Sequence, residues 1–117
     1  MIVEDEAGIR ALVRKILKRE GYEVLEAGNA EDALAMVAAQ GTEVRLLLTD
    51  VVLPGMGGRE LAQKMIASVP GVKVLYVSGY SDDEDVLAAR FPPGARFLQK
   101  PFTLSALVGK VREALES

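Results

Sequence analysis

The sequence contains no cysteine and no histidine in 117 residues. Without cysteine, the chain can form neither a disulfide framework nor a thiolate metal site. Without histidine, it cannot use Ser-His-Asp catalysis, a histidine-ligated zinc ion or a phosphohistidine of its own. Any chemistry that the chain carries out must therefore rest on other groups.

Long apolar runs and basic stripes are missing as well. No apolar run approaches the roughly 20 residues that a membrane-spanning helix needs, and the first residues do not resemble a signal peptide. The net charge is −3, with Lys and Arg spread along the chain. We therefore expect a cytoplasmic domain that binds neither membranes nor nucleic acids directly. The length is that of one domain, residues 1–117, and half of the residues are hydrophobic, which is enough for a core.

Short apolar runs alternate five times with helical patterns. The strand-like runs lie at 2–3, 23–27, 46–49, 74–77 and 96–99. Asn29 and Thr103 are placed to cap the second and fifth helices, and 82–89 is typical of a short fourth helix. These repeats predict an α/β fold, a flavodoxin-like, doubly wound (βα)5 three-layer sandwich around a parallel five-stranded sheet. In the fifth helix the expected buried stripe comprises Leu104, Leu107, Val108, Val111 and Leu115.

Strand composition predicts the order of the strands. The third and fourth runs are almost wholly apolar, as expected for strands covered on both faces, whereas the second and fifth carry polar residues that suit edges. This favours the order 2-1-3-4-5. Only three residues precede Glu4, fewer than the five or six that are typical of a strand, so we expect the first strand to be truncated at its N-terminus.

Polar residues follow four of these runs, at the point where each strand ends. They are Glu4 with Asp5, Asp50, Ser78 and Lys100. The carboxyl ends of parallel strands meet at one edge of the sheet, where open α/β sheets bind ligands. Converging carboxylates repel one another, and a divalent cation removes that conflict. A site of oxygen ligands with few carboxylates suits magnesium.

Each of these residues also has a plainer interpretation. Glu4 and Asp5 could be an acidic start to the first helix, favoured by its dipole. Asp50 and Ser78 could be turn residues, and Lys100 could be a solvated surface charge. A cis bond before Pro101 would aim Lys100 inward, but most X-Pro bonds are trans, so proline alone does not establish it. The joint placement in the right order is the stronger signal.

The sequence resembles the receiver domains of two-component response regulators over essentially its whole length. The motifs that carry the resemblance are Val3-Glu4-Asp5-Glu6, Asp50-Val51-Val52-Leu53-Pro54-Gly55-Met56-Gly57-Gly58 and Leu98-Gln99-Lys100-Pro101-Phe102. The segments at 53–61 and 77–81 look most like receivers attached to hybrid histidine kinases.

The resemblance implies a phosphoacceptor and a metal site. Asp50 would be the phosphoacceptor and would bind Mg²⁺, for which Mn²⁺ can substitute. Asp5 would ligate the metal directly, Glu4 through water, and the Val52 carbonyl would complete the protein ligands. Glu4 stands where many family members carry Asp, a change that retains the carboxylate.

The resemblance also implies a switch. Ser78, where many members carry Thr, matches the switch hydroxyl, and Phe97 matches the switch aromatic. Lys100 matches the phosphate-binding lysine that is followed by a cis proline, here Pro101. Phosphorylation would draw Ser78 toward the phosphoryl group and let Phe97 rotate inward, which changes a surface around the fourth helix, the fifth strand and the fifth helix.

The implied function is that of a phosphoacceptor in a phosphorelay, with only self-phosphorylation and slow self-dephosphorylation as activities of its own. The partner would be a sensor histidine kinase or a histidine phosphotransfer domain, and a kinase or effector domain could be attached. Ile9 and Phe102 flank the site and are candidates for docking the phosphodonor, with plain core packing as the alternative. Because Val52 cannot orient an attacking water and Tyr80 offers bulk with one hydroxyl, we expect a long-lived aspartyl phosphate.

Two other functions stay open at this point. A receiver-like scaffold could bind partners without being phosphorylated, although the retained site residues argue against it. A haloacid-dehalogenase-like phosphatase also uses an aspartate nucleophile and magnesium, but it needs a second aspartate at the position of Val52. A flavodoxin-like nucleotide-binding protein is more distant, because the glycines at 55–58 have no Walker lysine.

Overall fold

The computed structural model describes residues 1–40, 43–79 and 90–117. Five strands form one sheet in the order β2-β1-β3-β4-β5, and every neighbouring pair is parallel. Both the fold class and the strand order predicted from the sequence are confirmed. The strands are β1 (Ile2–Val3), β2 (Glu26–Ala27), β3 (Leu46–Asp50), β4 (Lys73–Ser78) and β5 (Arg96–Gln99).

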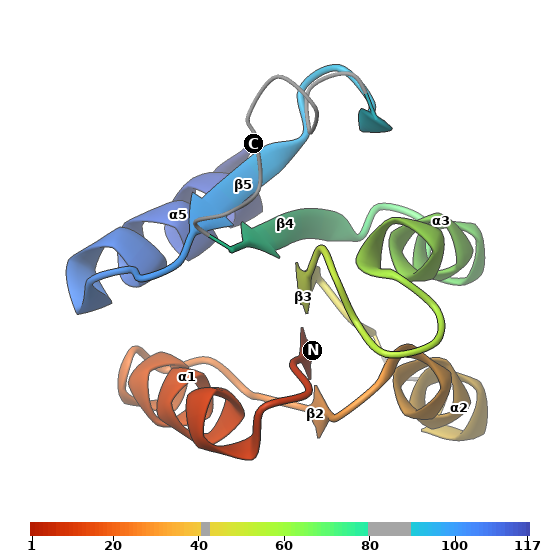
Figure 1. Cartoon of the computed structure of the whole chain (residues 1–117), viewed down its shortest axis with the longest axis horizontal. Helices are drawn as coiled ribbons and strands as arrows, with labels where there is room; N and C mark the ends of the chain where they lie inside the picture. The colour runs from red at the N-terminus through yellow and green to blue at the C-terminus, as the bar shows by residue number, and fades with distance from the viewer. Residues whose placement is uncertain (41–42, 80–89) are drawn as a thin grey trace.

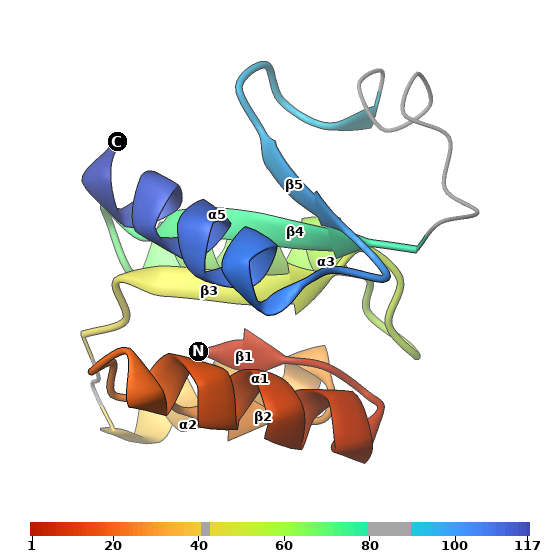
Figure 2. The same ribbon diagram turned by 90° about the vertical axis from the view of Figure 1, so that its left-hand side faces the viewer.

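Helices cover both faces of this sheet. They are α1 (Ala7–Arg19), α2 (Ala30–Gln40), α3 (Gly58–Ser68) and α5 (Leu104–Glu116). Helices α1 and α5 lie on one face and α2 and α3 on the other (Figures 1 and 2). The expected fourth helix at 82–89 lies outside the described residues.

Each face of the sheet has its own apolar core. Under α1 and α5, the core includes Ile2, Leu48, Leu75, Leu107 and Val111. The core under α2 and α3 includes Val3, Leu47, Leu61, Met65 and Tyr76. Successive residues of β1 and β3 therefore point into different cores, as the alternation of a strand with two covered faces requires.

The helix ends follow the predicted local chemistry. The Asn29 side chain accepts a hydrogen bond of 2.7 Å from the backbone N–H of Asp32, and Thr103 Oγ1 accepts one of 3.1 Å from Ala106 N–H. Both residues satisfy amides that a helix start leaves unpaired. Gly21, just after α1, has φ +92°, a left-handed conformation that glycine adopts without strain.

Two details of the sequence-based description were wrong. Leu104, the first residue of α5, is 56% exposed rather than part of the buried stripe of that helix. Ala114 is buried instead. The second strand was predicted over 23–27, but β2 is limited to Glu26–Ala27 because its only partner, β1, has two residues with which to pair. That β1 is truncated stays a prediction.

Candidate functional site

The register of the sheet brings the predicted polar residues to one edge. Asp50 is the last residue of β3 and pairs with Val77 of β4, and Ser78 pairs with Gln99, the residue before Lys100. Glu4 directly follows β1. Glu4, Asp50 and Ser78 are all buried, at 4–5% exposure, whereas Asp5 is exposed. Three polar side chains buried together at a strand edge indicate a site rather than solvated turns.

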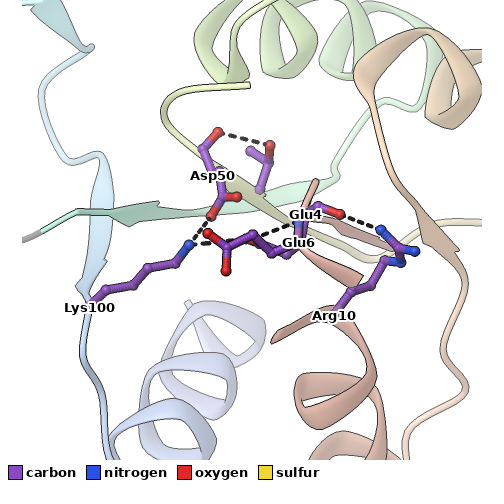
Figure 3. Close-up of polar contacts among 6 residues, drawn as sticks. Glu4, Glu6, Arg10, Asp50 and Lys100 are labelled. Carbon is purple, nitrogen blue, oxygen red and sulfur yellow. Dashed lines mark hydrogen bonds and ion pairs between the residues drawn. The ribbon is translucent and has the colours of Figure 1, made fainter. Parts of the chain in front are cut away.

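Lys100 is the counter-charge of this edge. Its Nζ lies 3.2 Å from Glu4 Oε2 and 3.2 Å from Asp50 Oδ1, so one ammonium bridges the two carboxylates (Figure 3). The ammonium donates hydrogen bonds to both Glu4 oxygens, whereas Asp50 Oδ1 has no hydrogen-bond partner among the described residues. The Lys100–Pro101 peptide bond is cis, and Lys100 itself points into the site.

One lysine does not balance the acidic charge. Burial, together with a hydrogen bond to Glu4 and repulsion from it, raises the pKa of Asp50 to about 8, although Lys100 opposes the shift. Burial lowers the pKa of Lys100, but attraction to Asp50 and Glu4 outweighs burial and leaves that pKa raised. The surroundings therefore shift the titration of Asp50 toward the protonated form, and further positive charge nearby would favour its ionisation.

The carboxylates present fit a magnesium ion. Glu4, Asp5 and Asp50 each offer an oxygen, and these oxygens lie within 4.8 Å of one another. The buried Asp50 Oδ1 accepts no hydrogen bond from the described residues and is paired only with the Lys100 ammonium, 3.2 Å away, so it can still offer an electron pair to a cation. Asp5 is exposed, which leaves the site open to solvent on one side. Oxygen-only ligands with room for water are what Mg²⁺ prefers.

The backbone around Glu4 is fixed by several contacts. Glu4 N–H donates to the Ala27 carbonyl (3.2 Å), and Glu6 N–H donates to Glu4 Oε1 (3.3 Å). The Arg10 guanidinium donates through Nη1 to the Glu4 carbonyl at 2.6 Å (Figure 3). Both the main chain and the carboxylate of Glu4 are thus held in place.

The loop after Asp50 is fixed at both of its ends. Val51 N–H donates to the Val77 carbonyl (2.9 Å), and Gly58 N–H donates to the Val51 carbonyl (3.1 Å). Met56 N–H donates to Glu31 Oε1 of α2 at 3.3 Å. Leu53 is buried, but Val52 is 71% exposed, so the side chain of Val52 projects outward from an ordered loop.

The expected switch aromatic belongs to a cluster of three rings. Phe97, half-buried on β5, stacks on Tyr76 of β4 with centroids 5.5 Å apart and an interplanar angle of 29°. Phe91 makes edge contacts with both rings, at centroid distances of 5.2 Å to Phe97 and 4.6 Å to Tyr76. Burial raises the pKa of the Tyr76 phenol, against the influence of Arg59. Phe97 is therefore packed against the core in this structure.

Ile9 and Phe102, the two candidates for docking the phosphodonor, lie beside the site and also pack in the core. Ile9 and Phe102 are half-buried and pack against the core under α1 and α5. Both also line a small cavity together with Glu4, Asp50 and Lys100. Their position beside the site agrees with the prediction, but their packing agrees equally with a structural role. Tyr80 lies outside the described residues.

Comparison with known proteins decides the family. The response regulator receiver domain family matches residues 1–112. The chain belongs to this family. The predicted resemblance is thereby confirmed, and the phosphatase alternative loses its basis because the match covers nearly the whole chain.

Individual proteins with receiver domains match this chain over nearly its whole length. The chain is 38% identical over 118 residues to the sensor kinase CckA of Brucella abortus (strain 2308), a match that covers 99% of this chain and 12% of CckA. It is 32% identical over 120 residues to the response regulator receiver protein CpdR of the same organism, covering 98% of this chain and 94% of CpdR. The crystal structure of the receiver domain from hybrid histidine kinase CckA has a TM-score of 0.81 at 32% identity, covering 97% of this chain and 95% of that chain.

Several curated relatives are much longer than this receiver domain. The chain spans 12% of CckA and 31% and 48% of two others. Within the described ranges, no helix is long and apolar enough to cross a membrane.

The sequence interpretation missed some residues of this receiver site. Arg10 and Glu31, which hold the backbone at Glu4 and Met56, were not singled out. Tyr76 and Phe91, which surround Phe97, were also missed. The only available signal was for Tyr76, whose position two residues before Ser78 places both side chains on the same face of the strand.

Proposed function

We propose that this receiver domain accepts a phosphoryl group on Asp50 from the phosphohistidine of a partner protein, in a magnesium-dependent reaction. The observation that carries the proposal is the burial of Asp50 between the other acidic residues and Lys100, whose Nζ is 3.2 Å from Asp50 Oδ1. The raised pKa of Asp50 supports it further, because a carboxylate that needs added cationic charge to ionise is ready for a cation and a phosphoryl group together.

In the proposed reaction, a carboxylate oxygen of Asp50 forms a bond to phosphorus as the P–N bond to the donor imidazole breaks. The electron pair of that bond leaves with the imidazole. Asp50 must be ionised to attack, and Lys100 holds positive charge beside the Asp50 carboxylate. Positioning and charge neutralisation supply most of the catalysis in phosphoryl transfer.

The proposed magnesium ligands are the Asp5 and Asp50 carboxylates, Glu4 through a water, and the Val52 carbonyl, with Mn²⁺ able to substitute. Bound Mg²⁺ would supply the positive charge that keeps Asp50 ionised and that neutralises phosphoryl oxygens. The convergence of three carboxylate oxygens within 4.8 Å supports this ligand set.

The proposed output is a two-state switch. The acyl phosphate attracts the Ser78 hydroxyl at the end of β4, and Phe97 on the neighbouring strand responds. Since Phe97 contacts both Tyr76 and Phe91, its movement changes the packing between β4, β5 and the segment that leads into β5. The altered surface would involve β5, α5 and the expected fourth helix, which lies outside the described residues.

The proposed partners are a sensor histidine kinase or a histidine phosphotransfer domain. The similarity to the receiver of CckA supports a place within or beside a hybrid histidine kinase. We propose no enzymatic activity for this domain beyond self-phosphorylation and slow self-dephosphorylation. Placement in the cytoplasm stays a prediction from the sequence.

The decisive experiment measures the intact mass of the chain after incubation with Mg²⁺ and acetyl phosphate. We expect one added phosphoryl group, lost in Asp50→Asn and in the presence of EDTA, and retained in the control Glu60→Gln on the exposed side of α3. No adduct on the folded wild-type chain would favour the phosphorylation-independent scaffold. An adduct that persists in Asp50→Asn would rule out Asp50 as the acceptor.

A further inference from the structure

Among the described residues, two basic side chains contact the acidic cluster of Glu4, Asp5 and Asp50: Lys100 and Arg10. Arg10 makes its contact through the backbone of Glu4. Its Nη1 donates a 2.6 Å hydrogen bond to the Glu4 carbonyl. That carbonyl belongs to the peptide unit that joins Glu4 to Asp5. A contact at this atom therefore restrains both of the residues whose carboxylates converge with Asp50.

The surroundings of Arg10 favour a fixed guanidinium. Its side chain is only 21% exposed, and its Nε lies 3.9 Å from Glu26 Oε1. A side chain at Gly28 would crowd it, because a Cβ there would stand 3.2 Å from Arg10 Nη1. The planar fork of arginine spans a carbonyl and a carboxylate at once, which a point charge does less well.

The ion pair with Glu26 limits the effect of Arg10 on the field of the site. A bare guanidinium beside the carboxylates would repel a dication, and Glu26 offsets part of this charge while it also accepts two hydrogen bonds from Arg14, at 3.1 and 3.2 Å. The effect of Arg10 that favours the site is geometric. It fixes the chain that presents two of the three carboxylates.

We infer that Arg10 is a positioning residue for the magnesium site, which holds the Glu4–Asp5 peptide unit so that both carboxylates face Asp50. The inference rests on the proposed function, since it assigns Arg10 a role toward the proposed cation. Groups that orient metal ligands commonly change metal affinity by about 10- to 100-fold when they are removed.

The test is the affinity for Mg²⁺ of the whole chain, measured by calorimetric titration at low and at high salt. We expect Arg10→Gln to bind Mg²⁺ about 10-fold more weakly at both salt concentrations. Arg10→Lys should recover part of the loss, because an ammonium can still donate to the Glu4 carbonyl. Arg14→Gln is the matched control: it removes the same charge from the same helix and the same partner, Glu26, without touching Glu4, and should stay within about twofold of the wild type.

Whether Arg10→Gln weakens or tightens Mg²⁺ binding distinguishes a positioning role of Arg10 from an effect of its charge. If Arg10 acted only through its charge, its removal would tighten Mg²⁺ binding, and high salt would abolish the difference. The inference is overturned if Arg10→Gln binds Mg²⁺ as tightly as the wild type or more tightly. If that variant does not fold, Arg10→Lys decides: intermediate weakening supports positioning, and unchanged or tighter binding overturns it.

A second readout excludes a general loss of structure. In EDTA, both Arg10→Gln and Arg14→Gln should remain folded and lose a contact with Glu26, with Arg10→Gln the more destabilised because it also loses the hydrogen bond to the Glu4 carbonyl. Only Arg10→Gln should lose Mg²⁺ affinity. Absence of Mg²⁺ binding in the wild type would contradict the proposed function, whereas binding that Asp50→Asn weakens and Arg10→Gln does not would contradict this inference alone.

Discussion

Gly58, the first residue of α3, lies directly against the backbone of Asp50. A Cβ added to Gly58 would overlap the Asp50 carbonyl oxygen and would also crowd Cα of Val51. These neighbours are backbone atoms, which cannot turn aside as a flexible side chain can. The start of α3 and the proposed phosphoacceptor thus approach each other at a distance that only glycine permits.

We expect Gly58→Ala to destabilise the domain by about 1–3 kcal/mol, the usual cost of overpacking, and to slow phosphorylation by displacing Asp50. Urea unfolding and the rate of adduct formation with acetyl phosphate measure the two effects. Gly109→Ala is the matched control, because a Cβ there meets nothing within 4 Å, and alanine in a helix interior is favoured by roughly 0.5–1 kcal/mol. Equal stability of the two variants would contradict the prediction, because it would show that the backbone at Asp50 and Val51 shifts to accommodate a Cβ at Gly58 without cost.

The raised pKa of Asp50 predicts a pH dependence of stability in EDTA. The pKa of Asp50 is about 8 in the folded protein against 3.8 for the ordinary carboxyl, so the folded state binds this proton more tightly than the unfolded state. The stability contributed by protonation is therefore complete below about pH 4 and is lost as the pH rises toward about 8.

The measurement is the free energy of unfolding against pH for the wild type and Asp50→Asn in EDTA. The free energy of unfolding of the wild type relative to that of the variant should fall between pH 4 and 8. Subtracting the two values cancels the contribution of other titrating groups, such as the Met1 amine, whose pKa burial lowers to about 6. Saturating Mg²⁺ should flatten or reverse the trend, because metal ligands must be deprotonated. A difference that does not vary with pH would contradict the raised pKa.

Lys100 should have opposite effects on metal binding and on phosphorylation. Lys100→Met removes a cation that lies 3.2 Å from both Glu4 and Asp50, so Mg²⁺ should bind more tightly. Phosphorylation by acetyl phosphate should nevertheless slow by about 10²-fold, since a preorganised charge near the transferred group is lost. Lys64→Met, at an exposed position of α3, should change neither. Unchanged phosphorylation in Lys100→Met would remove Lys100 from the proposed mechanism.

The exposed side chain of Val52 bears on the lifetime of the aspartyl phosphate. Val52 is 71% exposed and has no group that can hydrogen-bond to an attacking water. We expect Val52→Asn to shorten the half-life of the phosphorylated domain, because an amide can orient that water. Val52→Ala, which also opens space, is the control. A half-life that is unchanged in Val52→Asn, or that falls equally in Val52→Ala, would contradict the expectation.

Docking and core packing at Ile9 and Phe102 can be distinguished by the phosphodonor. If these residues contact the donor protein, Ile9→Ala and Phe102→Ala should slow transfer from a phosphorylated histidine phosphotransfer domain and leave the rate with acetyl phosphate unchanged. Both side chains are half-buried in the core under α1 and α5, so stability is measured in parallel. Equal slowing with both donors would indicate packing.

The sequence was sufficient for the sheet and for the residues at its carboxyl edge. Strands covered on both faces are mostly apolar, so composition separated β3 and β4 from the edge strands and placed Asp50 and Ser78 at the same end of the sheet. The caps at Asn29 and Thr103 were predictable because their hydrogen bonds are local.

The contacts that refine the site were not predictable in the same way. Arg10 and Glu31 act through long side chains that reach backbone atoms 6 and 25 residues away in sequence, and no periodicity specifies where a charged side chain ends. Leu104 fits the apolar stripe of its helix, but it is exposed at the helix start, because burial depends on tertiary packing that helical periodicity does not specify. The length of β2 depends likewise on its partner.

The loop from Val51 to Gly58 loses its conformational freedom when the domain folds. Hydrogen bonds at Val51, Met56 and Gly58 and the burial of Leu53 restrict it before any ligand arrives. The entropic cost of ordering this loop therefore belongs to folding and not to cation binding. The Val52 carbonyl, a proposed magnesium ligand, thus belongs to a backbone that would need little further ordering when a cation binds.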